Sequence, residues 1–203
     1  MHSILEKIIR EEIGPNLKNL GFKKKGLNWN KNLQSHVLCL NIQSSMYNTS
    51  DQSKFTINFG VFNSEAFEIF YNKNPPDFPK EIDCFIRIRI GDLLSSYEDF
   101  WYTIDNNTEY ENLRDSIENH FEHFIIPFLE KLAKIDDLLN YLLTTKHITD
   151  FPVTGIIYFA IFLIKHGKIE FGSEIFKKAI TSTNSKIFRD KLTGIAANLR
   201  INV

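Results

Sequence analysis

The sequence is poor in cysteine and has almost no net charge, and each scarcity excludes a class of protein. Of its 203 residues, two are cysteines, Cys39 and Cys84, and the formal net charge at pH 7 is −1. Two cysteines do not make the disulfide framework of a small secreted domain, so we expect reduced thiols and a cytoplasmic location. Without a charge excess, any attraction to nucleic acid or to a membrane surface must come from a local site.

Long hydrophobic runs and familiar catalytic motifs are also missing. The longest apolar stretch, Val153–Ile164, is about a dozen residues long, whereas a membrane-spanning helix needs about 20. The first residues lack the apolar region of a signal peptide. The sequence has no glycine-rich phosphate loop, no nucleophile elbow and no His-Glu-x-x-His motif. We therefore expect no membrane association and no cofactor, and no motif assigns a catalytic residue.

The clearest pattern that is present is the alternating segment Cys84–Leu93. Its two sets of alternate residues are Cys84, Ile86, Ile88 and Ile90 on one side, and Phe85, Arg87 and Arg89 on the other. This alternation predicts a strand with a buried isoleucine face and a second face that carries two positive charges. It also places Cys84 on the buried face, whereas Cys39 falls on the polar face of its own strand, so we expect no disulfide between the two.

Other segments complete the prediction of an α+β fold. Short or alternating strands are expected at Leu27–Lys31, Val37–Ser44 and Lys54–Phe62, and the aromatic segment Phe100–Ile104 either adds an edge strand or ends a turn. Their short links favour an antiparallel meander of about four to five strands. An N-terminal helix kinked at Gly14-Pro15 and a long central helix, capped by Asn107 or Thr108 and bent or restarted at Pro127, have apolar stripes. Both helices are expected to cover the isoleucine face of the sheet.

The last third of the chain is expected to be entirely helical. The predicted helices are Ile135–Leu143, Val153–His166, Ile169–Ile180 and Ser185–Leu199. This pattern divides the chain into an α+β domain, residues 1–132, and an all-helical extension, residues 133–203. The extension either forms an appended bundle or packs over the polar face of the sheet and closes it.

Several short motifs occur in an order that resembles a known family. The motifs are Gly21–Gly26, Asn41–Ser44, Phe55–Gly60, Cys84–Leu93 and Trp101-Tyr102. In this order they resemble the bacterial domain-of-unknown-function 4304 family over roughly residues 4–132, although Tyr102 stands where that family has a second tryptophan. The resemblance implies an α+β domain in a soluble bacterial protein. It implies no activity and no catalytic residue.

The polar face of the predicted sheet is the first candidate binding site. Its side chains are Asn41, Gln43, Thr56, Asn58, Arg87 and Arg89. Amide and guanidinium groups can bind a carboxylate or a phosphate through several directed hydrogen bonds. The alternative is an ordinary outer face that is hydrated or internally paired, because one-sided antiparallel sheets normally alternate in this way.

Three smaller clusters carry weaker signals. Lys23, Lys24 and Lys25 could contact a nucleic-acid backbone, but three lysines at a turn more often form a solvated corner. His120 and His123 are an incomplete shell for a metal, so no metal site is expected. Cys39 and His36 are three residues apart on an extended chain, so they point to opposite faces and do not form a nucleophile–base pair within one strand.

These patterns favour a non-catalytic protein-binding module over an enzyme. An immunity-like or accessory role is one version of that function. The alternative is the binding or turnover of an anionic small molecule on the polar sheet face, and weak nucleic-acid binding through Lys23–Lys25 is the third possibility. The partner is expected to be another protein, and the sequence leaves the oligomeric state open.

Overall fold

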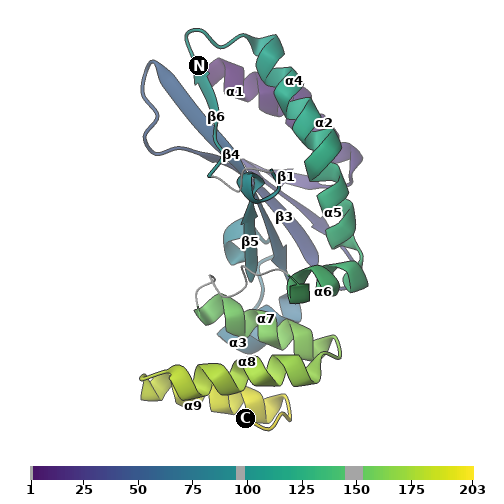
Figure 1. The fold of residues 1–203 in the computed structure, drawn as a ribbon, viewed down its shortest axis with the longest axis vertical. Helices are drawn as coiled ribbons and strands as arrows, with labels where there is room; N and C mark the ends of the chain where they lie inside the picture. Colours follow the sequence, from purple (N-terminus) through teal and green to yellow (C-terminus); the bar gives the residue numbers. More distant parts are fainter. Residues whose placement is uncertain (1, 95–98, 145–152) are drawn as a thin grey trace.

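The computed structural model describes residues 2–94, 99–144 and 153–203, and it has the α+β architecture that the sequence predicted. A twisted sheet is covered on one face by two long helices, and a layer of shorter helices packs at one end (Figure 1). The strands are β1 (Lys23–Lys25), β2 (Asn28–Asn32), β3 (Val37–Ser44), β4 (Gln52–Phe62), β5 (Ile86–Arg89) and β6 (Tyr102–Asp105).

The sheet is an antiparallel meander in the order β1-β2-β3-β4-β5, and β6 also pairs with β4. β4 is long enough to pair with two strands along one edge. Its residues 58–61 pair with β5, and its residues 52–55 pair with β6. β5 and β6 therefore lie end to end as one interrupted edge strand, and Thr56 and Ile57 of β4 pair with neither of them.

β5 is shorter than the predicted strand Cys84–Leu93. A 3₁₀ turn, Ile90–Asp92, ends it, because the Asp92 carboxylate accepts a hydrogen bond from the backbone N–H of Arg89 (2.8 Å). At its other end the alternation also fails. Cys84 lies on the polar side of the sheet beside Gly60, and Phe85 is buried against α7 (Val153–Lys165). The prediction that Cys84 shares the isoleucine face, and that Phe85 shares a polar surface with the arginines, is wrong.

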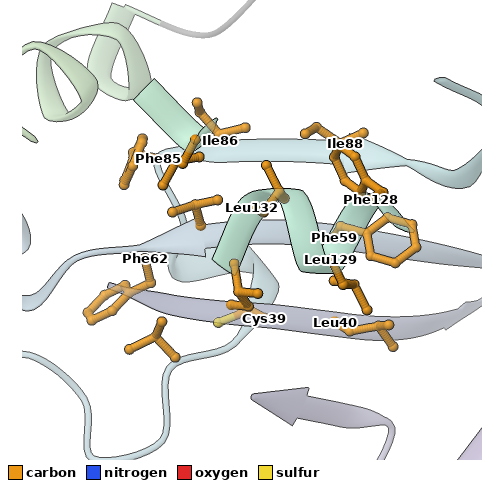
Figure 2. Close-up of a cluster of buried hydrophobic side chains, with 14 of the residues drawn as sticks. Cys39, Leu40, Phe59, Phe62, Phe85, Ile86, Ile88, Phe128, Leu129 and Leu132 are labelled. Atoms are coloured by element: carbon orange, nitrogen blue, oxygen red, sulfur yellow. The ribbon is translucent and has the colours of Figure 1, made fainter. Parts of the chain in front are cut away.

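Two long interrupted helices cover the isoleucine face, as predicted. Their segments are α1 (His2–Ile8) and α2 (Gly14–Asn19) in the first, and α4 (Tyr110–His120) and α5 (Ile126–Ala133) in the second. Figure 2 shows Phe128, Leu129 and Leu132 of α5 over the strands, and the Phe128 ring meets that of Phe59 edge to face at 5.9 Å. α4 starts at Tyr110 without a side-chain cap, because the Thr108 hydroxyl instead accepts from the backbone N–H of Asp105 (2.8 Å).

Each long helix accommodates its proline by means of a π-helical turn. The turns are Ile9–Ile13, before Pro15, and Phe121–Ile125, before Pro127. In both, the backbone N–H that follows the turn bonds to the carbonyl five residues back, Gly14 to Ile9 and Ile126 to Phe121. The proline then begins the next α-helical segment, where a missing N–H costs little. The predicted interruptions at both prolines are therefore confirmed, and the extra residue in the turn explains how the helices continue.

The C-terminal helices share the core of the sheet. The helices outside the two long ones are α3 (Ser64–Tyr71), α6 (Ile135–Thr144), α7, α8 (Ile169–Ser182) and α9 (Lys186–Asn198). α7 packs against α3 and against the end of the sheet, where the Phe162 ring lies 4.9 Å from Phe85 and the Tyr158 ring 6.4 Å from Phe62. Within the described ranges, no helix is both long and apolar enough to cross a membrane.

Candidate functional site

The strand register brings the predicted polar residues onto one face of the sheet. Two rows of directly opposed residues cross five strands. One row is Lys25, Asn28, Asn41, Asn58 and Arg89, and the next is Lys23, Asn30, Cys39, Gly60 and Arg87. Gln43 and Thr56 are opposed in a further row beside Asn41 and Asn58. The six candidate residues therefore share one surface, which we call the polar sheet face.

Arg89 is the centre of a cluster on this face. Its Nε donates to Asn58 Oδ1 (3.1 Å) and its Nη2 to Gln43 Oε1 (3.4 Å), and Asn58 Nδ2 also donates to Gln43 Oε1 (2.8 Å). The Asp99 carboxylate forms an ion pair with Arg89 and accepts from the indole N–H of Trp101 (3.0 Å). These two bonds, the Trp101 bond first, lower the pKa of Asp99, so the carboxylate is held in its charged form.

Arg87 belongs to a separate ion pair. Its Nε and Nη2 both donate to the carboxylate of Glu81, whose side chain is buried. The hydrogen bond with Glu81 raises the pKa of Arg87 further above its already high value. A buried carboxylate needs such a partner, since leaving a charge uncompensated costs several kcal/mol. The two arginines therefore do not form a joint anion site, and each is neutralised by an acid of the chain itself.

The remaining candidate residues bind parts of the backbone. The Thr56 hydroxyl donates to the carbonyl of Phe100 (2.8 Å), which closes the gap between β5 and β6. The amide of Asn41 donates to the carbonyl of Leu27 (3.2 Å) and to Asn28 Oδ1 (3.0 Å). Across the part of the chain that the structure describes, no buried side-chain nitrogen or oxygen lacks a partner. These contacts favour the alternative of an internally paired outer face.

The three lysines form the edge strand β1, and all are exposed. Successive residues of a strand point to opposite faces, so Lys24 lies away from Lys23 and Lys25. The Lys24 ammonium sits 5.1 Å from the Trp29 ring, and the Lys25 ammonium sits 5.9 Å from the ring of Phe78. The strand therefore splits the three charges between two faces, which weakens them as a joint phosphate site.

The two histidines of the long helix have different surroundings. His120 Nδ1 lies 2.7 Å from the hydroxyl of Tyr102, and burial lowers the pKa of His120. His123 is exposed, and its Nε2 lies 4.0 Å from the Glu122 carboxylate. Among the residues that the structure places, no group of three or more His, Cys, Asp or Glu side chains is arranged to hold a metal ion.

A cleft that the sequence did not predict lies at the turn between β2 and β3. Its volume is about 520 Å³, and residues 32–37, 63–65, 76, 77, 79 and 165–166 contribute to its walls. His36 Nε2 is 2.8 Å from the carbonyl of Leu132, and a carbonyl only accepts, so Nε2 carries the proton. His36 Nδ1 then accepts from the Ser35 hydroxyl (2.8 Å). Both ring nitrogens are thus occupied by groups other than Cys39.

The cleft has charges of both signs. Lys165 is ion-paired with Glu65 (2.6 Å), and Asp77 adds a carboxylate from the proline-rich segment, residues 74–79. Burial lowers the pKa of His36, and the nearby His166 adds to this effect, so His36 is neutral at pH 7. Four separate segments meet in this cleft, and no spacing along the chain relates them, which is why sequence patterns could not find it.

The two cysteines also meet on the polar sheet face, contrary to the prediction of opposite faces. Cys39 is directly opposed to Gly60, and a Cβ placed on Gly60 would lie 2.6 Å from Cys84 Sγ. Glycine at this position therefore makes room for the side chain of Cys84. Both cysteines are free thiols.

An apolar groove runs along α8. Its volume is about 460 Å³, and it is lined by Phe171, Glu174, Ile175, Lys177, Lys178 and Thr181. The residues follow helical spacing, so they form a continuous stripe on one side of the helix. The opposite side of α8, with Gly172, Phe176 and Ala179, is buried.

Comparison with known proteins gives one match, to a protein family. A family model described as "Domain of unknown function (DUF4304)" matches residues 13–131, more than half of the chain. No curated protein and no solved structure matches. The match begins after α1, covers α2, the sheet and most of the second long helix, and ends before the C-terminal helices.

Proposed function

We propose that this chain, which belongs to the DUF4304 family, is a non-catalytic protein-binding module of the bacterial cytoplasm. An immunity-like or accessory role is one version of this proposal. The observation that carries it is the groove along α8, in which Phe171 exposes 42% of its surface. Exposed apolar surface gathered in a groove, unlike scattered single residues, marks sites of protein contact.

The exposed stripe is not needed to hold α8 in place. The other side of the helix already packs closely on α7: a Cβ at Gly172 would lie 2.5 Å from Ile164 Cγ1 and 2.9 Å from the carbonyl oxygen of Ala160. Phe176 is fully buried on this side. One face of α8 therefore anchors the helix, Ile175 is partly buried against the core, and the exposed ring of Phe171 is left for a partner.

The chemistry of the groove indicates the kind of partner. Phe171 and Ile175 supply an apolar floor four residues apart, and Lys177 and Lys178 supply two cations against the single acid Glu174. This surface fits an amphipathic protein segment that has apolar residues at helical spacing and acidic residues beside them. On the polar sheet face, by contrast, both arginines are already neutralised by Glu81 and Asp99.

The test is affinity capture from the native host at low salt, with the partner identified and its recovery measured for a set of variants. Phe171→Ser and the double variant Lys177→Glu/Lys178→Glu should each reduce recovery of the same protein at least about tenfold, since tenfold corresponds to about 1.4 kcal/mol. Met46→Ser is the matched control, because Met46 is 88% exposed at the distant tip of the β3–β4 hairpin. Undiminished recovery by Phe171→Ser, or a small molecule that co-purifies with no protein, would contradict the proposal.

The second candidate function is the binding of an anionic small molecule at Arg89. The observation in its favour is the convergence of Asn58, Gln43 and Arg89, with the Asp99 carboxylate occupying the place of a ligand anion. Asp99 is 62% exposed, so a carboxylate or phosphate could replace it. Titration with inorganic phosphate should then give saturable heat in Asp99→Asn and none in Arg89→Gln. Equal heats in the two variants would exclude this site.

A further inference from the structure

We propose that Cys39 and Cys84 form a dithiol that hydrogen peroxide converts into an intramolecular disulfide on the polar sheet face. This inference does not depend on the groove of α8. It rests on the position of Gly60 between the two thiols and on the backbone groups that both thiols contact.

Gly60 sets the distance between the two cysteines. Cys39 on β3 is directly opposed to Gly60 on β4, and Cβ atoms of opposed residues lie about 4.5–5.5 Å apart. The Cβ of Cys84 lies 2.7 Å, and its Sγ 2.6 Å, from the place that a Cβ on Gly60 would occupy. Cys84 therefore occupies the space that a side chain on Gly60, directly opposite Cys39, would fill. A disulfide requires Cβ atoms about 3.5–4.5 Å apart, so it would form here by a small shift of the backbone together with rotation of the two thiols toward each other.

Both thiols also point at the same stretch of backbone. Cys39 Sγ donates to the carbonyl of Pro79 (3.5 Å), and Cys84 Sγ donates to the carbonyl of the next residue, Lys80 (3.4 Å). Two sulfurs that share adjacent carbonyls lie close together. Burial raises the pKa of the Cys84 thiol, the neighbouring Cys39 adds to this effect, and the charges of Glu81 and Asp83 act in the same direction.

The chemistry begins at Cys84, which is half-buried, whereas Cys39 is fully buried. The Cys84 thiolate attacks peroxide and breaks its O–O bond, which gives a sulfenic acid and hydroxide. The Cys39 sulfur then attacks the sulfenic sulfur, and the S–O bond breaks with loss of water. In total two thiols and one peroxide give one disulfide and two waters. Because the thiolate is the reacting form, the reaction is slow at neutral pH and faster in alkali.

Oxidation should loosen the proline-rich segment from the sheet. A disulfide has no S–H group, so the bonds to the carbonyls of Pro79 and Lys80 are both lost. The hydrogen bond that Asn30 Nδ2 donates to the carbonyl of Pro79 (3.1 Å) remains. Pro79 and Asp77 line the cleft beside His36, so the oxidised protein should have an altered cleft wall.

The test is mass spectrometry of the full chain after peroxide treatment, with remaining thiols alkylated in denaturant. The wild type should lose about 2 Da, take up no alkyl group and yield a peptide pair joined through Cys39 and Cys84. Amide exchange in residues 73–83 should be faster in the oxidised form than in the reduced form. Alkylation of both cysteines, or a disulfide that joins two chains only, would overturn the proposal.

Single variants separate the dithiol from two independent thiols. In Cys39→Ser, peroxide should leave a sulfenic acid at Cys84, which a dimedone probe traps, and the loss of about 2 Da should vanish. In Cys84→Ser, the buried Cys39 should stay reduced over the same time. The circular dichroism spectrum and the unfolding midpoint show whether each variant is folded. A folded Cys84→Ser whose Cys39 oxidises as fast as Cys84 does in the wild type would contradict the order of steps.

Discussion

At the scale of single residues, the buried isoleucine face of β5 and the buried histidines are the most informative positions. Ile88 is directly opposed to Phe59 on β4, and Figure 2 shows both beneath Phe128 of α5. Burial lowers the pKa of both His36 and His120. A change at Ile88 should affect the stability of the whole chain, and the histidines should affect how that stability depends on pH.

Replacing Ile88 by Asp should unfold the protein. The substitution removes apolar burial worth about 2 kcal/mol and places an uncompensated carboxylate in the core, for a total loss of about 4 kcal/mol or more. A domain of this kind is stable by about 5–15 kcal/mol. Urea unfolding followed by circular dichroism measures the loss. Thr103→Asp, on an exposed position of β6, is the control and should change stability by less than about 0.5 kcal/mol.

Acid should destabilise the protein through His36. Burial lowers its folded-state pKa below the ordinary value of about 6.5, so the unfolded chain binds this proton more readily. The stability is complete above pH 6.5 and is lost as the pH falls from there towards the lower folded-state pKa. His36→Gln keeps a donor for the Leu132 carbonyl and should flatten the dependence of the unfolding free energy on pH. An unchanged slope would assign the effect to other groups, with His120 first among them.

At the scale of elements, the π-helical turns decide how the two long helices cover the sheet. Each turn adds one residue before a proline, at Pro15 and at Pro127. The helix keeps its direction and continues to bury its apolar stripe on both sides of the break. A π turn also brings backbone atoms five residues apart into contact, which changes what a glycine substitution does there.

Two glycine substitutions should have effects of opposite sign. In an ordinary helix, replacing Gly by Ala adds about 0.5–1 kcal/mol of stability. Gly194 in α9 is exposed with open space around it, so Gly194→Ala should show that gain. A Cβ on Gly14 would lie 2.8 Å from the carbonyl oxygen of Ile9, so Gly14→Ala should instead cost about 1–3 kcal/mol. Denaturant midpoints compare the two, and a gain for both would mean that the turn relaxes without cost.

At the scale of the whole molecule, the C-terminal helices and the sheet share aromatic contacts. Tyr158 of α7 donates to the carbonyl of Asn63 (2.7 Å) and accepts from its N–H (3.1 Å), and its ring meets those of Phe62, Phe67, Tyr71 and Phe85. The division of the chain at residue 132 into two domains stays a prediction. These contacts argue that the two parts unfold together.

Unfolding should therefore be one cooperative transition. Both tryptophans, Trp29 and Trp101, lie before residue 132, so their fluorescence reports on the sheet, whereas circular dichroism at the helical wavelength also reports on the C-terminal helices. The two denaturation curves should coincide. Tyr158→Phe should shift both by about 1–3 kcal/mol, because it leaves the buried N–H of Asn63 without its acceptor and removes one of the donors to the Asn63 carbonyl, which keeps the N–H of Phe67. Tyr71→Phe, on a more exposed ring, is the control; separate curves would support two domains.

The sequence alone determined the elements whose signal is local. Alternation gave β3 and β4, apolar spacing with prolines gave the interrupted long helices, and the four C-terminal helices begin within a residue or two of their predicted starts. The faces of these elements follow from the same periods, so the polar residues from Asn41 to Arg89 were placed on one surface correctly. Periodicity is fixed by backbone geometry, which no distant contact changes.

The tertiary structure alone decided which side chains meet. Alternation placed Cys84 on the wrong face because the chain leaves strand geometry two residues before β5, where the empty side of Gly60 accepts its sulfur. The ion-pair partners of Arg87 and Arg89 are Glu81 and Asp99, which lie outside any strand, so the alternation of strand residues could not predict them. The cleft at His36 and the thiol pair join segments far apart in the chain. Such contacts depend on where loops return to the sheet, and this is settled by packing and by the pairing of buried charges rather than by local sequence.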